Sequence, residues 1–303
     1  MLSIVIPAYN EEGMIKIAAE TISQLMEKEC IEYEIIFIND GSKDNTWASI
    51  RTVASINYHI RGASFSRNFG KESAIFAGLS EAKGDCVVVI DCDLQHPPEK
   101  IVDMFRLWEH GYEIIEGVKS NRGRETGSHR IAANIFYAFM SNATGIDMAN
   151  ASDFKLLDRK AVNVLLNMPE KNAFFRALSS WIGFNSTRIE YEVQERVAGE
   201  SKWSTFALIK YAITNITSFT TAPMQIVTLL GVITFVVSLT FSICTLYQKI
   251  IGVALEGFTT IIILLGFIGS IIMISLGIIG YYIAKVYEEI KCRPRFIVAE
   301  RIN

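Results

Sequence analysis

Two long stretches without a charged side chain constrain this chain more than any other feature of its sequence. The first runs from Tyr211 to Gln248 and the second from Gly257 to Ala284. A helix that crosses the roughly 30 Å hydrocarbon core of a bilayer needs about 20 apolar residues, and each stretch exceeds this length. With a mean hydropathy of +0.28, they predict two membrane spans, at about 224–247 and 259–283. The alternative is a pair of buried core helices.

The flanking charges predict how these spans are oriented. Met1 leads directly into the apolar run LSIVIPAYN with no basic segment before it, so we expect no signal peptide and a cytoplasmic N-terminal domain. By the positive-inside rule the C-terminal tail is cytoplasmic as well. One lysine, Lys249, lies between the spans, whereas five cations follow the second span: Lys285, Lys291, Arg293, Arg295 and Arg301. The net charge of −3 disfavours a general nucleic-acid binder.

Short β-rich runs alternate with helical patterns over the first 120 residues. The expected strands are 3–9, 33–39, 60–64, 85–91 and 112–118, and the expected helices are 12–29, 45–57, 71–82 and 99–110. The first, second and fourth strands are almost continuously apolar, which is typical of a parallel sheet covered on both faces. The sequence therefore predicts an α/β domain with a mostly parallel sheet.

Polar clusters follow three of these strands. They read PAYNEE, NDGSKD and DCDLQ, and the carboxyl ends of the strands are where open α/β sheets bind ligands. We therefore expect one cleft to hold the side chains of Glu11, Asp40, Asp91, Asp93 and Gln95. Neither a G-x-G-x-x-G nor a G-x-x-x-x-G-K-[ST] motif is present, so dinucleotide-binding and P-loop chemistry lack support.

The D-x-D at the end of the fourth strand is the strongest single chemical signal. If Asp91 and Asp93 are both on the strand, they point the same way, and two close carboxylates repel unless a cation or a proton neutralises one of them. Mg²⁺ and Mn²⁺ take such oxygen ligands together with substrate phosphates. The pair could therefore hold a divalent ion on a diphosphate, although D-x-D also arises by chance.

The order of the motifs resembles one family along nearly the whole chain. IVIPAYNEE, INDGSKD, SRNFGKESA, VVIDCDLQHPPE, ASDFKLLDR and ERVAGESKW are similar to the family-two glycosyltransferases of GT-A fold. The two C-terminal spans narrow the resemblance to the polyprenyl-phosphate glycosyltransferases, which include dolichol-phosphate mannose synthases and bactoprenol glucosyl transferases. The hairpin favours the bacterial, bactoprenol branch and therefore a bacterial inner-membrane location.

The resemblance implies a role for each matching position. Asp91, Asp93 and Gln95 would hold Mg²⁺ or Mn²⁺, and Asp153 would lie near the acceptor, as a base or as a positioning group. Residues at the nucleotide-sugar pocket would be Pro7, Tyr9, Glu11, Asp40, Arg122, Arg124 and Ser201. Arg130, with Arg122 or Arg124, lies in the stretch where the family keeps arginines for phosphates. Arg196, Ser201 and Lys202 match the R-x-x-G-x-S-K pattern, which closes over the donor or the lipid phosphate.

Simpler structural roles remain open for several of these residues. Asp40 could form an Asx turn, Asp153 could cap a helix, Arg122 and Arg124 could be solvated, and Lys202 could anchor at the membrane interface. His96 and His129 have no partner at metal-ligand spacing, and we interpret both as structural.

The resemblance predicts four segments and one reaction. The segments are a catalytic domain (1–202), an interfacial amphipathic helix (203–222), two spans (223–284) and a cytoplasmic basic tail (285–303). The reaction moves one hexose from a nucleotide sugar, with UDP the expected nucleotide, to undecaprenyl phosphate. A processive polysaccharide synthase and a non-catalytic scaffold are the alternatives; the absence of Q-x-x-R-W disfavours the first. Glycines in the second span would permit close contact between helices, so assembly into a homo-oligomer such as a tetramer is a further alternative.

Overall fold

The computed structural model describes residues 1–120, 152–170, 174–192, 222–251 and 257–303. Its contacts divide the chain into two compact units. The first comprises Met1–Thr205 together with Pro294–Asn303, and the second comprises Phe206–Arg293. The boundaries expected near residues 202 and 222 fall at or beside segments outside the described residues.

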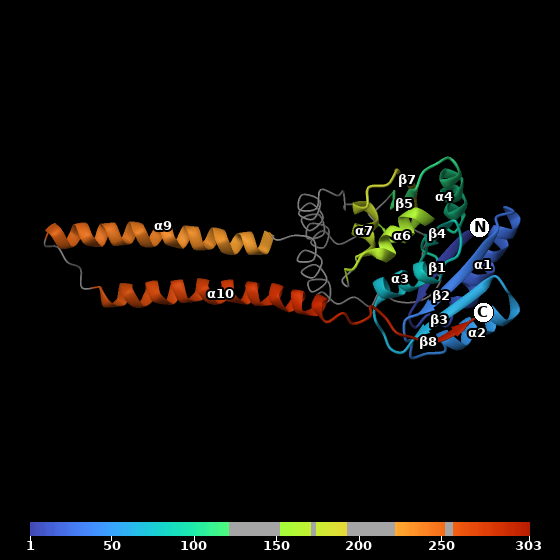
Figure 1. The fold of residues 1–303 in the computed structure, drawn as a ribbon, viewed down its shortest axis with the longest axis horizontal. Helices are drawn as coiled ribbons and strands as arrows, with labels where there is room; N and C mark the ends of the chain where they lie inside the picture. The colour runs from blue at the N-terminus through green and yellow to red at the C-terminus, as the bar shows by residue number, and fades with distance from the viewer. Residues whose placement is uncertain (121–151, 171–173, 193–221, 252–256) are drawn as a thin grey trace. The chain divides into compact units, whose positions relative to one another are not determined.

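An eight-stranded sheet forms the first unit (Figure 1), in the order β7-β5-β6-β4-β1-β2-β3-β8. Strands β3, β2, β1 and β4 are parallel to one another, β5 is parallel to β7, and β6 and β8 run antiparallel to their neighbours. The strands are β1 (Leu2–Ala8), β2 (Tyr33–Asn39), β3 (Ile60–Phe65), β4 (Cys86–Val89), β5 (Ile114–Lys119), β6 (Lys155–Asp158), β7 (Ser186–Tyr191) and β8 (Val298–Ile302). The predicted mostly parallel α/β sheet is confirmed.

Helices cover the sheet on both faces, which is why its central strands are apolar at nearly every position. Strands β2 and β4 are buried at every residue, as the continuous apolar runs predicted. Leu2, Ile4 and Ile6 belong to one core cluster with residues of α1, α2 and α4. On the other face, α3 lies so close to β1 that a Cβ added at Gly78 would meet Val5 at 2.1 Å. The helices are α1 (Ile15–Lys28), α2 (Thr46–Ile56), α3 (Lys71–Glu81), α4 (Glu99–Glu109), α6 (Arg159–Asn167) and α7 (Phe175–Trp181).

The C-terminal ten residues return to the sheet of the first unit, which the sequence analysis did not anticipate when it treated 285–303 as a basic tail. Strand β8 pairs antiparallel with β3. Trp47 donates to Glu300 at 2.8 Å, Arg301 pairs with Glu81 at 2.9 Å, and the Asn303 amide donates to the carbonyls of two other residues. These contacts cover an edge of the sheet that would otherwise leave backbone groups unpaired.

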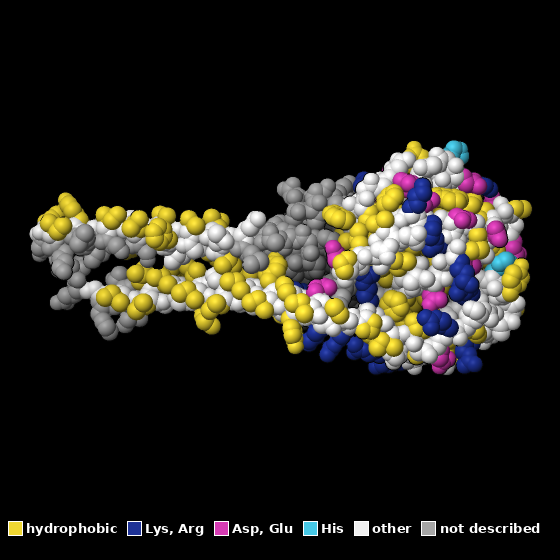
Figure 2. All heavy atoms as spheres, viewed as in Figure 1, with side chains coloured by type: hydrophobic (Ala, Val, Ile, Leu, Met, Phe, Trp, Pro, Cys, Tyr) yellow, Lys and Arg dark blue, Asp and Glu magenta, His cyan; other side chains and the backbone are white. Residues whose placement is uncertain are grey.

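The second unit contains two long helices, α9 (Ala222–Ile251) and α10 (Phe258–Ile290), which run side by side in opposite directions (Figure 1). Within α10, Leu264–Tyr287 is long and apolar enough to cross a membrane, and none of the apolar window within it is buried. Among the described residues of α9, the apolar segment Val227–Phe241 is shorter than that threshold. Figure 2 shows hydrophobic side chains along both helices. Phe235 on α9 and Leu265 and Met273 on α10 are each more than half exposed.

Candidate active site

The loops that follow β1 and β2 are joined to each other at the carboxyl edge of the sheet. The Asn10 side chain accepts from the Lys43 N–H at 2.9 Å, and the Asn10 N–H donates to Ser42 at 3.0 Å. The Glu11 N–H donates to the Thr46 hydroxyl at 2.9 Å. These bonds hold the PAYNEE and NDGSKD loops against each other. Both polar clusters lie at the carboxyl edge of the sheet, where the sequence placed them.

Asp40 binds a third loop, the one that precedes α3, at this edge of the sheet. Its buried carboxylate accepts the backbone N–H of Phe69 at 2.7 Å and that of Gly70 at 2.9 Å, just before α3 begins. Burial raises the pKa of the Asp40 carboxyl, and these two N–H groups oppose the rise. Gly41, at φ +63°, lies under the same loop, where an added Cβ would be 2.3 Å from the Arg67 carbonyl carbon. In this structure Asp40 therefore positions the start of α3, and contact with a nucleotide stays a prediction.

Asp91 and Asp93 lie in a turn rather than on a strand. Strand β4 ends at Val89, the Leu94 N–H reaches back to the Asp91 carbonyl at 3.4 Å, and Leu94 has φ +53°. The Asp93 carboxylate accepts the Gln95 N–H at 3.2 Å. The expected strand 85–91 was therefore too long, and the argument from strand alternation was wrong, because the backbone curls at Cys92 and Asp93.

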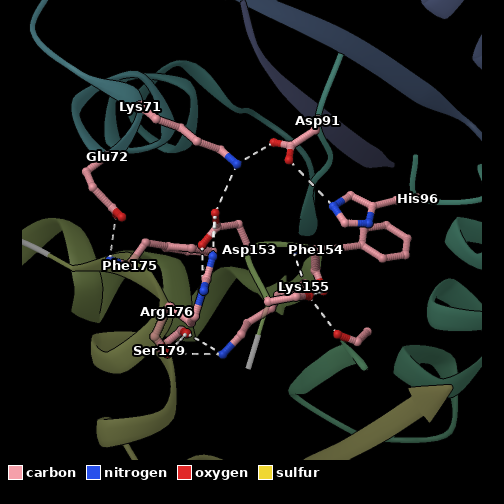
Figure 3. Close-up of polar contacts among 12 residues, drawn as sticks. Lys71, Glu72, Asp91, His96, Asp153, Phe154, Lys155, Phe175, Arg176 and Ser179 are labelled. Atoms are coloured by element: carbon pink, nitrogen blue, oxygen red, sulfur yellow. Dashed lines mark hydrogen bonds and ion pairs between the residues drawn. The ribbon is translucent and has the colours of Figure 1, made fainter. Parts of the chain in front are cut away.

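Lys71, the first residue of α3, connects two carboxylates that are far apart in the sequence. Its ammonium lies 2.6 Å from Asp91 Oδ1 and 2.9 Å from Asp153 Oδ2 (Figure 3). Arg176, on α7, donates two hydrogen bonds to the Asp153 carboxylate, of 3.1 and 3.0 Å. Two cations and two anions therefore alternate at this edge of the sheet, and their charges balance.

The pKa values of the carboxyl groups in this cluster are shifted in opposite directions. Burial is the largest single influence and raises the pKa of both Asp91 and Asp153. Lys71 together with His96 at Asp91, and Lys71 together with Arg176 at Asp153, outweigh it, so both pKa values fall well below the usual range. Glu72 differs because the charges of Lys71 and Arg176 act on its carboxylate more weakly than burial and the charge of Asp153 do. Burial, and next the charge of Asp153, raise the pKa of Glu72 to about 7, although the carboxylate accepts the Phe175 N–H at 2.8 Å.

His96 supports Asp91 from the other side. Its Nε2 lies 3.6 Å from Asp91 Oδ2, and its ring stacks on Phe154 with a centroid distance of 5.1 Å (Figure 3). Tyr191 meets the same ring edge-on at 5.2 Å. The histidine is buried. The sequence suggested a structural role for it, and in the structure one of its contacts is a residue of the site.

Lys155, two residues after Asp153, is fully buried behind the cluster. Its ammonium contacts Glu116 at 3.0 Å, the hydroxyls of Ser179 and Ser180, and the carbonyl of Arg176. Because Arg176 also holds Asp153, the Lys155 contacts fix α7 behind the site. Burial lowers the pKa of Lys155, and Glu116 opposes this.

The donor atoms at the D-x-D turn fit a hard divalent cation that shares its ligands with a substrate. Asp91 and Asp93 offer carboxylate oxygens, and Gln95 adds an amide oxygen, which are the ligands that Mg²⁺ and Mn²⁺ prefer. Within the described residues, no group of three His, Cys, Asp or Glu side chains is placed to hold a metal. A cation here would therefore depend on oxygens from water and from a bound diphosphate.

The remaining predicted positions divide into two groups. Pro7 is within β1, Tyr9 is 41% exposed just after it, and Glu11 is half-buried in the joined loops. The other six lie outside the described residues: Arg122, Arg124, Arg130, Arg196, Ser201 and Lys202.

Sequence reasoning missed four members of the cluster: Lys71, Glu72, His96 and Arg176. Lys71 and Glu72 belong to SRNFGKESA, a motif that supported the family resemblance but suggested no role for either residue. His96 follows the D-x-D directly, so its closeness to the site was a usable signal. Arg176 lies in no motif, and nothing in the sequence pointed to it.

Comparison with known proteins identifies the family of the chain. The family model for glycosyl transferase family 2 matches residues 3–166. An uncharacterized glycosyltransferase of Bacillus subtilis is 37% identical over 98% of this chain and 92% of its own length. A bactoprenol glucosyl transferase of Shigella phage SfX is 35% identical over 99% of both chains.

A solved structure shares the fold of the first unit. Glucosyl-3-phosphoglycerate synthase from Mycobacterium tuberculosis, in complex with Mn²⁺, UDP and glucosyl-3-phosphoglycerate, matches with a TM-score of 0.50 and 20% identity, over 72% of this chain and 80% of that chain. At this identity the match establishes the fold alone, which is GT-A. Because the family model covers more than half of the chain and the relatives match almost all of it, the protein belongs to glycosyl transferase family 2.

Proposed function

We propose that this glycosyltransferase moves one hexose from a nucleotide sugar, with UDP as the expected nucleotide, to a polyprenyl phosphate at the cytoplasmic face of a bacterial inner membrane. One observation carries the proposal: Asp91 and Asp153 meet through Lys71 at the carboxyl edge of the sheet, in a chain that also has an exposed apolar helix of spanning length. The names of the phage relatives support the lipid acceptor.

The D-x-D turn is the proposed donor side of the site. Asp91, Asp93 and Gln95 would hold Mg²⁺ or Mn²⁺, which supplies charge neutralisation for the departing nucleoside diphosphate. Arg122 or Arg124, with Arg130, Arg196 and Lys202, are proposed to add positive charge around the two phosphate groups, and Ser201 to contact the donor. Pro7, Tyr9, Glu11 and Asp40 are proposed to border the nucleotide.

Asp153 is the proposed acceptor side. Its two bonds to Arg176 and its contact with Lys71 keep the carboxylate ionised and fixed in direction. A phosphate acceptor is already ionised at neutral pH, so it needs no strong base. We therefore assign Asp153 to orienting the acceptor rather than to removing a proton. A single in-line displacement inverts the anomeric carbon, so an α-linked donor gives a β-linked lipid product.

The membrane arrangement is proposed to be a hairpin with both ends on the catalytic side. Residues 294–303 are part of the same compact unit as residues 1–205, so the chain that leaves this unit must return to it. If α10 crosses a bilayer, α9 has to cross it in the other direction. Near the C-terminal end of α10, Lys285 and Lys291 lie over the rings of Tyr281 and Tyr287, a combination typical of a membrane interface.

The test combines purified full-length protein in detergent with undecaprenyl phosphate, Mn²⁺ or Mg²⁺, and a panel of radiolabelled sugar nucleotides. We expect one labelled lipid, extractable into organic solvent and lost when a chelator is added. Asp93→Asn should remove at least 99% of the product. Asp103→Asn, an exposed aspartate on α4 that pairs with Lys100, should retain the wild-type rate.

Two results would contradict the proposal. Label that accumulates in a long polymer rather than on a lipid would favour a processive synthase. The absence of product with every donor, from protein that unfolds at the wild-type temperature, would favour a scaffold.

A further inference from the structure

The Lys71 ammonium is paired with the carboxylate of Asp91, which is a proposed ligand of the metal ion. The ammonium is 2.6 Å from Asp91 Oδ1, and the other oxygen of Asp91 faces His96 at 3.6 Å. A divalent cation brought to Asp91 would therefore meet a positive charge already in contact with its ligand, and like charges at this distance repel. Metal binding at Asp91 and the contact of Lys71 with Asp91 compete.

The backbone of Lys71 is held firmly, whereas the side chain has room to move. Asp40 binds the N–H groups of Phe69 and Gly70, the two residues before Lys71. The Lys71 side chain is 43% exposed and has four rotatable carbon–carbon bonds, so its ammonium can turn away from Asp91 without moving α3. An incoming diphosphate offers the ammonium a replacement anion.

The two carboxylates respond differently when Lys71 leaves. Asp153 keeps its two bonds to Arg176 and stays neutralised. Asp91 keeps only the contact to His96 among the contacts just described, so it is the carboxylate left in need of a cation. The exchange therefore frees a ligand for the metal at Asp91 and leaves the acceptor side of the site in place.

We propose that Lys71 holds Asp91 in place of the divalent cation until a nucleoside diphosphate binds, and then transfers its ammonium from Asp91 to the diphosphate. This inference rests on the proposed function, because it takes the D-x-D turn as the donor site. It makes metal and nucleotide bind as a coupled pair: each strengthens the other, and the coupling is reciprocal. The protein without nucleotide then has a low affinity for metal.

The test measures Mn²⁺ binding directly, by the electron paramagnetic resonance signal of free Mn²⁺, in full-length protein with and without UDP. For the wild type, UDP should tighten Mn²⁺ binding at least tenfold. In Lys71→Met the affinity for Mn²⁺ without UDP should rise at least tenfold, and the effect of UDP should shrink at least threefold. Lys71→Gln, which keeps a hydrogen-bond donor without the charge, should behave like Lys71→Met.

Two control variants make the outcome specific to position 71. Lys71→Arg keeps the positive charge and should keep the weak Mn²⁺ binding of the wild type. Lys100→Met removes one positive charge from α4, where Lys100 pairs with Asp103 at 2.8 Å, and should leave both affinities unchanged. If Lys100→Met tightens Mn²⁺ binding as much as Lys71→Met, the effect is general electrostatics and the inference is overturned.

The failure of this inference is distinguishable from the failure of the proposed function. Unchanged or weaker Mn²⁺ binding in folded Lys71→Met and Lys71→Gln overturns the exchange, while lipid-linked product from the wild type still supports the transferase. Mn²⁺ binding that survives Asp93→Asn places the metal elsewhere and overturns both the exchange and the donor site.

Discussion

The buried Lys155–Glu116 pair gives a sharp test of how the candidate site is supported from behind. Lys155 is fully buried, and its ammonium contacts Glu116, two serine hydroxyls and a backbone carbonyl. Lys155→Met keeps much of the side-chain volume but leaves Glu116, within the part of the chain that the structure describes, with Arg188 as its one ion-pair partner, at 3.5 Å. Removing one partner of a buried ion pair costs roughly 3–5 kcal/mol. We expect about 3 kcal/mol here, because Arg188 compensates in part.

The assay is thermal unfolding of the full-length protein in detergent, followed by tryptophan fluorescence. For a domain of this size, about 3 kcal/mol corresponds to a decrease in Tm of roughly 6–12 °C. Lys160→Met is the matched control: Lys160 is 76% exposed, and its nearest carboxylate is 3.9 Å away, so its cost should stay below about 0.5 kcal/mol.

A double-mutant cycle tests whether the Glu116 carboxylate left without Lys155 causes the loss of stability. Lys155→Met combined with Glu116→Gln removes the unpaired carboxylate, so the double variant should recover at least half of the loss in Tm. If the losses of the two single variants simply add, or if Lys155→Met costs less than about 1 kcal/mol, the pair does not support the site as we infer.

Three further predictions address the loops, the sheet edge and the response to pH. Gly41→Ala should cost about 2–4 kcal/mol in a urea titration, since it adds a clash to a positive φ; Gly111→Ala, at φ +94° with open space around it, should cost only about 1 kcal/mol, and equal losses would refute the clash. Truncation after Arg293 removes β8 and should lower the Tm of the first unit by at least 5 °C; an unchanged Tm would show that the strand adds no stability. The pKa of Glu72 is raised to about 7, so the folded state keeps a proton that the unfolded state releases near its ordinary pKa. Stability should therefore fall by on the order of 2 kcal/mol as pH rises from about 4.5 to 7, and Glu72→Gln should flatten this part of the pH profile.

The sequence alone determined the α/β class and the edge of the sheet that carries the site. A continuously apolar strand reports that both faces of the sheet are covered, so β1, β2 and β4 could be recognised from their residues. All four predicted helices of the first 120 residues formed within a few positions of their expected bounds. The family resemblance could also be recognised, because the motifs and their order are present in the sequence itself.

Only the tertiary structure decided which side chains meet at the site. Lys71 reaches Asp153 across 82 positions of sequence, and Arg176 comes from a helix with no recognisable motif. The turn at Cys92 and Asp93 replaced the expected strand, because a backbone reversal depends on local dihedral angles that apolar periodicity does not report.

The same reason explains the C-terminal strand. The residues VAERI show a weak alternating pattern whose partner is β3, more than 230 positions earlier, and pairing between distant segments leaves no local signal. Arg295 and Arg301, counted in the sequence as positive charge of a cytoplasmic tail, bind the carbonyls of Met168 and Glu170 and the carboxylate of Glu81. Periodicity reports how each segment is buried, whereas the partner of each charge is fixed only when the segments pack together.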